Sequence, residues 1–170
     1  MLRRLAVVMV AAAGFVACNG TPTASSKWSD PTTIQYYPGL HVDISRMTKT
    51  ASGVFYRDSI IGTGTAAIRP GDQVVVHYTL WLPDGTLIDN NQGQALGPFA
   101  LTNANVIQGW VDGLPGAVQG TTRQLVIPPP LAYGSVGSGT TIPGNASLVF
   151  LVTVDRVIPA SGDVVATQGR

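Results

Sequence analysis

Most side chains that could form a functional site in this sequence are aromatic or aliphatic, and the sequence contains few nucleophiles or metal ligands. The single cysteine, Cys18, ends an apolar N-terminal run, and the two histidines, His41 and His77, have no metal-ligand spacing. No phosphate-binding or dinucleotide-binding glycine pattern is present. We therefore expect a function based on binding and orientation, with no metal, no cofactor and no covalent step.

A candidate binding site can be assembled from apolar residues that lie far apart in the sequence. Its expected members are Tyr78, Ile88, Phe99, Val106, Ile107, Trp110, Tyr133, Ile142 and Phe150. Each of them could equally be an ordinary core residue. Trp110 is the most unusual, because it follows Gly109 in a predicted helix that ends near Leu114, before Pro115. So short a helix adds little stability by itself, so the indole must be held there for another reason.

Composition limits the class of protein. The chain has 170 residues, a formal net charge of +1 and only 11% charged residues, all nine acidic ones being aspartate. This balance gives no electrostatic reason to expect nucleic acid as a partner. The 45% of hydrophobic residues suffice for one core, and the 20 glycines and 12 prolines favour strands and turns.

The N-terminus is typical of an exported protein. Residues 1–17 combine a basic start with an apolar run too short to span a bilayer comfortably, which predicts a signal peptide. The stretch F-V-A-C at 15–18 resembles a bacterial lipobox, so we expect Cys18 to be acylated and the protein to be lipid-anchored to a bacterial membrane, on its periplasmic or cell-surface face. The alternative is an ordinary signal peptide with an incidental cysteine. Residues 18–40 are predicted to be a flexible tether. Three aromatic residues within it, Trp28, Tyr36 and Tyr37, could dock on the domain.

The remaining chain predicts an α+β domain over residues 41–159, followed by a polar tail at 160–170. Residues 73–82 alternate, with Val74, Val76, Tyr78, Leu80 and Leu82 on one face. The predicted strands are 41–47, 52–64, 73–82, 86–89, 123–127 and 147–157, with a helix near 107–114. We therefore predict an antiparallel sheet of five to six strands wrapped around one short α-helix.

Five motifs in order carry a family resemblance: VVHYT, DGTLID, VIQGW, IPPPLAYG and LVFLV. Over about residues 50–158 the chain resembles the FKBP-type peptidyl-prolyl cis-trans isomerases, and its N-terminus suggests a bacterial lipoprotein member. The resemblance implies an FKBP-like fold and an isomerase that acts on X–Pro bonds of exported polypeptides. It also implies binding of tacrolimus or rapamycin-type macrolides, and we expect a monomer.

The same resemblance implies roles for individual residues. Trp110 would form the floor of a proline-binding pocket, and Tyr133 would direct its hydroxyl to a substrate carbonyl. Asp89 would hydrogen-bond Tyr78, although it could also be only a solvated turn residue. The implied catalytic set is Tyr78, Asp89, Trp110, Tyr133 and Phe150, and the implied substrate-binding set is Ile88, Phe99, Val106, Ile107 and Ile142.

Some positions depart from the family pattern. Ile88 stands where many members carry phenylalanine, and the segment 98–107 leaves open whether Phe99 or Leu101 forms the pocket wall. Two other functions remain open at this point. The domain could bind proline-containing segments without useful turnover, or it could be a scaffold lipoprotein of the same fold.

Overall fold

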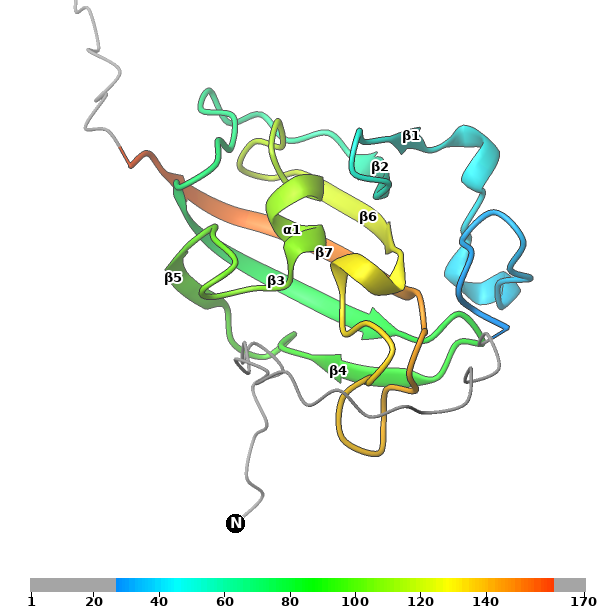
Figure 1. Ribbon diagram of the computed structural model, residues 1–170. Coiled ribbons are helices and arrows are strands. Elements are labelled where there is room, and N and C mark those ends of the chain that lie inside the picture. Colours follow the sequence, from blue (N-terminus) through cyan, green and yellow to red (C-terminus); the bar gives the residue numbers. More distant parts are fainter. Residues whose placement is uncertain (1–26, 161–170) are drawn as a thin grey trace, which may run out of the picture.

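Two long antiparallel strands form the centre of the sheet. The computed structural model describes residues 27–160. Within this range β3 (Gln73–Trp81) pairs along its whole length with β7 (Leu148–Ile158). Leu80 lies opposite Phe150 in this register, and Tyr78 lies opposite Val152. Figure 1 shows these two strands side by side. Their register brings Tyr78 and Phe150, from two distant motifs, onto one face of the sheet.

The sheet has seven strands in the order β1-β2-β6-β7-β3-β4, with β5 also paired to β3, and all pairings are antiparallel. The other strands are β1 (Thr48–Lys49), β2 (Phe55–Ile60), β4 (Leu87–Asn90), β5 (Leu96–Ala100) and β6 (Thr122–Ile127). The predicted α+β class and antiparallel sheet are confirmed, but the expected number of five to six strands is wrong. β1 and β5 were not predicted, and the strand expected at 41–47 is absent because a 3-10 helix occupies Ile44–Arg46.

The alternation in β3 places the core where the sequence predicted it. Val74, Val76, Tyr78 and Leu80 are all at most 5% exposed and belong to the main core cluster. The same cluster contains Leu125 and Ile127 from β6 and Phe150 from β7. One face of the sheet therefore carries the core that the helix covers.

The other face of the sheet is covered by a segment that precedes β1, residues 36–47. Its apolar side chains pack on Phe55, Val126 and Val149; they are Tyr36, Leu40, Val42, Ile44 and Met47. Tyr36 and Leu40, which belong to the stretch expected to be a flexible tether, therefore pack against the domain. Trp28 also packs against the main core cluster, and its carbonyl accepts a hydrogen bond from the Ser147 amide at 2.9 Å. The expected lipidation site at Cys18, the signal peptide and most of the polar tail lie outside the described residues.

The single α-helix of the described residues, α1 (Gln108–Gly113), lies across the core face of the sheet (Figure 1). Its two glycines lie against β6. A Cβ at Gly109 would come within 2.3 Å of Ile127 Cγ2, and one at Gly113 within 2.9 Å of Leu125 Cδ2. Glycine is therefore needed at both positions for the close approach of helix and sheet. None of the helices in residues 27–160 is long and apolar enough to cross a membrane.

Candidate functional site

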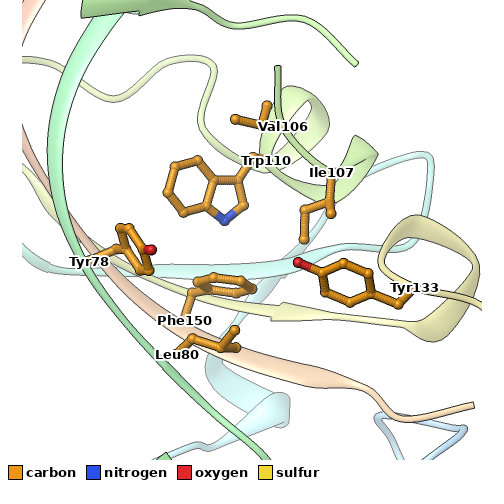
Figure 2. Close-up of a pocket in the computed structure, with 7 residues that line it drawn as sticks. All are labelled: Tyr78, Leu80, Val106, Ile107, Trp110, Tyr133 and Phe150. Carbon is orange, nitrogen blue, oxygen red and sulfur yellow. The ribbon is translucent and has the colours of Figure 1, made fainter. Parts of the chain in front are cut away.

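A small apolar cleft opens between α1, the core face of the sheet and the loop that follows β6 (Figure 2). It encloses about 300 Å³ of empty space, part of which is open to solvent. Its lining residues are Tyr78, Leu80, Val106, Ile107, Trp110, Tyr133 and Phe150. Apolar walls with a few convergent polar groups are typical of small-ligand sites.

Trp110 forms the base of this cleft, with aromatic rings arranged around it. Its ring stands edge-on to both Tyr78 and Phe150, with centroid separations of 5.5 Å and interplanar angles of 79° in each case. Within the described residues the buried indole Nε1 has no hydrogen-bond acceptor, and Figure 2 shows this nitrogen on the side of the ring that faces Phe150. An N–H directed at an aromatic face is a weak but favourable contact. The surrounding rings therefore fix the orientation of the indole.

Asp89 and Tyr78 form the polar corner of the site. The Tyr78 hydroxyl donates to Asp89 Oδ2 at 2.5 Å, and the Asn90 amide donates to Asp89 Oδ1 at 2.9 Å. Burial raises the pKa of Tyr78, and the hydrogen bond to Asp89 raises it further. The Tyr78 hydroxyl therefore stays protonated and keeps one orientation, with the carboxylate as its acceptor.

The side chain of Asn91 holds the same stretch of β3 in place. Its Oδ1 accepts from the Tyr78 amide at 2.6 Å, and its Nδ2 donates to the Val76 carbonyl at 3.0 Å. The side-chain amide of Asn91 thus makes hydrogen bonds to the β3 backbone that a neighbouring strand would otherwise make, just beyond the end of β4. Nothing in the sequence distinguished Asn91 as a site residue, because an asparagine after a strand is typical of a turn.

Tyr133 and Ile107 face each other across the mouth of the cleft (Figure 2). The Tyr133 hydroxyl is directed toward the cleft, and burial, followed by the charge of Asp89, raises the pKa of Tyr133 to about 12. Ile107 is the N-cap residue of α1, so its backbone adjoins the end of the helix that faces the opening. Both residues are partly exposed and can be reached by a ligand.

Not all of the expected site residues line the cleft. Phe99 lies beside it, with its ring 6.3 Å from that of Trp110, while Leu101 is 1% exposed in the core. Of these two, only Phe99 is therefore accessible beside the cleft. Ile88 packs against the core from β4, and Ile142 is 3% exposed within the core. Neither of these isoleucines lines the cleft.

Leu80 lines the cleft but was not among the expected site residues. Its signal was present in the sequence, because Leu80 shares the inward face of β3 with Tyr78. In a strand of alternating apolar residues, however, nothing separates a cleft residue from a core residue.

A second, more polar recess adjoins the cleft at Tyr78 and Asp89. It is lined further by the segment 90–97, which contains Asn90, Gln92 and Gln94. No group of three or more histidine, cysteine or acidic side chains with metal-binding potential occurs in residues 27–160. The chemistry that the site offers is therefore an apolar seat for a ring, with hydroxyl and amide donors at its rim.

Comparison with known proteins agrees with this arrangement. The FKBP-type peptidyl-prolyl cis-trans isomerase family matches residues 64–155. FK506-binding protein 2 of Yarrowia lipolytica is 45% identical over 97 residues, which cover 54% of this chain and 67% of that protein. The FK506-binding protein of Neisseria meningitidis serogroup B is 36% identical over 107 residues, which cover 62% of this chain and 96% of that protein.

Solved structures show the same fold. The crystal structure of FkpA from Escherichia coli has a TM-score of 0.60 at 40% identity, over 67% of this chain and 52% of that one. A peptidyl-prolyl cis-trans isomerase from Pseudomonas syringae has a TM-score of 0.62 at 30% identity, over 72% of this chain and 87% of that one. The expected FKBP-like fold is thus confirmed. The chain belongs to the family of FKBP-type peptidyl-prolyl cis-trans isomerases, enzymes that interconvert the cis and trans forms of X–Pro peptide bonds.

Proposed function

We propose that the cleft above Trp110 binds the proline ring of an exported polypeptide and accelerates rotation of the preceding peptide bond without a covalent step. The observation that carries this proposal is the lining itself, which combines a buried tryptophan floor with two tyrosines and contains no nucleophilic thiol, imidazole or metal-binding cluster. Uncatalysed exchange of X–Pro bonds takes tens to hundreds of seconds at 25 °C.

The chemistry requires only that the site bind the twisted amide better than either planar form. The barrier near 18–20 kcal/mol arises from amide resonance, which twisting removes. Loss of resonance reduces the charge on the carbonyl oxygen, so an apolar cleft disfavours the twisted state less than the planar states. Binding the twisted state more tightly than the ground states raises turnover.

Polar groups at the rim would hold the carbonyls on either side of the rotating bond. The Tyr133 hydroxyl, directed toward the cleft, would donate to one substrate carbonyl. The backbone amide of Ile107, at the N-terminal end of α1, would donate to another. The Asp89–Tyr78 pair would keep a fixed dipole beside the amide that rotates.

A coupled cis-to-trans assay on short X–Pro peptides tests this proposal with residues 19–170. We expect catalysed exchange that depends on the residue before proline and that Tyr133→Phe diminishes. Peptide binding without catalysis would instead identify a proline-binding module of the same fold. Absence of both would refute the assignment of the cleft.

We also propose that this cleft binds FK506 (tacrolimus) or a related macrolide. Relatives in Yarrowia lipolytica and Neisseria meningitidis carry the name FK506-binding protein, and the apolar, aromatic lining of the cleft suits such a ligand. FK506 should inhibit the isomerase competitively with the peptide, at one equivalent per chain. Inhibition that leaves the apparent KM unchanged would place the macrolide elsewhere.

Export and lipid anchoring complete the proposal. The basic start, the apolar run and F-V-A-C at 15–18 support processing at Cys18 with acylation of its thiol. Cys18→Ser should abolish lipid labelling and either release the protein from membranes or leave it unprocessed. A Cys18→Ser protein that matures and fractionates with membranes as the parent does would refute the lipoprotein assignment.

A further inference from the structure

Arg123 is a buried cation that ties the sheet to the helix carrying Trp110. It lies on β6, on the same face as Leu125 and Ile127, and is 3% exposed. Directly opposite it on β2 stands Asp58, and the two side chains pair through two contacts, Nε to Oδ1 at 2.6 Å and Nη2 to Oδ2 at 2.9 Å. The Tyr56 ring lies 4.4 Å from the guanidinium carbon. The Asp58 carboxylate therefore holds one edge of the guanidinium, and the Tyr56 ring packs against its face.

The remaining guanidinium nitrogen reaches the C-terminal end of α1. Nη1 donates to the carbonyls of Gly113 and Pro115 at 2.9 Å each, and lies 3.4 Å from the Leu114 carbonyl. The last carbonyls of a helix have no partners within the helix and carry partial negative charge. The guanidinium of Arg123 therefore donates hydrogen bonds to several carbonyls at the end of the helix.

The position of this contact relative to the cleft gives it a functional consequence. Trp110 precedes the contacted residues by one turn, and the Leu114 amide donates to the Trp110 carbonyl at 3.0 Å. α1 has only six residues, so it cannot hold its own geometry. The contacts of its glycines with β6 set how close the helix lies to the sheet, and Arg123 donates hydrogen bonds to carbonyls at and just beyond its C-terminal end.

We propose that Arg123, held by Asp58, is a positioning residue that fixes α1 along its axis and so sets the place of the Trp110 floor in the cleft. The inference rests on the role proposed above for Trp110. Arg123 does not line the cleft, so it acts on substrate only through the helix. Loss of its contacts should therefore weaken seating of the proline ring, which raises KM, more than it lowers kcat.

A double-mutant cycle separates this positioning role from a general contribution to stability. The variants are Arg123→Met, Trp110→Leu and the two combined, each checked for folding by circular dichroism and assayed well below its melting temperature. A displacement of about 1 Å at a positioned group can cost about a hundredfold. For a smaller displacement we expect Arg123→Met to raise KM about tenfold. In the Trp110→Leu background the same change should alter KM by less than about twofold, because the group it positions is gone.

Arg57 provides a matched control. It is an arginine on β2 that donates to the His41 carbonyl at 3.0 Å and lies 3.4 Å from Gln124 Oε1, and neither contact involves α1. Arg57→Met therefore removes an arginine that bridges segments without touching the helix, and it should leave KM unchanged. If Arg123→Met does not fold, Asp58→Asn replaces it in the cycle, since it weakens the anchor but retains the guanidinium.

The possible outcomes are distinct. Parental KM in folded Arg123→Met, or in Asp58→Asn where that variant is used, overturns the inference. So does a KM effect of the same size with and without Trp110, because it would show that the arginine does not act through the indole. If Trp110→Leu itself leaves KM unchanged, the floor role of Trp110 fails, and the positioning role fails with it. A raised KM in Trp110→Leu alone, with Arg123→Met at the parental value, refutes the positioning role but leaves the proposed function intact.

Discussion

Replacing Asp89 by leucine should lower turnover by removing the acceptor that orients Tyr78. The Tyr78 hydroxyl is 2.5 Å from Asp89 Oδ2, and Tyr78 is 5% exposed, so leucine at position 89 would leave the hydroxyl of a largely buried tyrosine without its acceptor. A hydrogen bond to a charged group contributes about 1.5–3 kcal/mol. If that free energy is expressed in the transition state, kcat should fall about ten- to hundredfold, since each 1.36 kcal/mol is tenfold in rate.

The assay measures kcat and KM on an X–Pro peptide, after circular dichroism has shown that the variant is folded. Binding of a proline ligand should weaken much less than turnover, because Asp89 does not line the apolar cleft that seats the ring. Asp84→Ala is the matched control. Asp84 accepts a hydrogen bond from the Thr86 amide at 3.0 Å in the turn before β4, and it lines neither the cleft nor the adjoining recess, so its loss should leave kcat unchanged. A folded Asp89→Leu enzyme that turns over at the parental rate would show that Asp89 is a turn residue only.

Four further predictions concern the Trp110 floor, the effect of pH on turnover and on stability, and the packing of the helix. Trp110→Leu should raise KM more than it lowers kcat, as steady-state kinetics will show, because the ring seat serves planar and twisted amides alike. Turnover should vary little between about pH 6 and 8, since no side chain lining the cleft titrates there; a bell-shaped profile would point to acid–base catalysis. Burial raises the Tyr133 pKa from 10.0 to about 12, so the stability it contributes is fully present below pH 10.0 and is lost as the pH rises through about 12; urea melts of the parent and Tyr133→Phe will measure this loss. Gly109→Ala places a Cβ 2.3 Å from Ile127 Cγ2 and should destabilise the fold by about 1–3 kcal/mol, whereas Gly93→Ala, with nothing within 4 Å, should not.

The alternation of apolar residues and the positions of glycine and proline were enough to predict the main elements. The inward face of β3 from Val74 to Leu80, the long strand β7 and the limits of α1 near Gly113 and Pro115 all follow from local rules. One predicted strand is nonetheless absent, and two strands of the structure were not predicted. The segment 41–47 alternates as a strand would, but Asp43 accepts from the Ser45 amide at 3.1 Å and starts a 3-10 helix instead. β5 was missed because Gly97 and Pro98 interrupt it, and both residues normally argue against a strand. β1 was missed because it is only two residues long.

The residues of the cleft, too, could be predicted from the sequence only in part. Tyr78, Trp110, Tyr133 and Phe150 were expected in the site, and the structure brings them together around one cleft. The sequence could not separate Leu80, which lines the cleft, from Ile142, which is buried in the core, since both are aliphatic residues in apolar surroundings.

The sequence by itself determined which residue types are available, how they alternate and where the helix must stop, because these properties depend on neighbours within a few positions. Only the tertiary structure decided that Arg123 is buried beside the end of α1, that Asn91 holds β3 through two hydrogen bonds and that residues 36–47 cover the outer face of the sheet. Each of these depends on contacts between segments far apart in the chain. An arginine within a strand looks like a solvated side chain until the fold places Asp58 and the end of a helix around it.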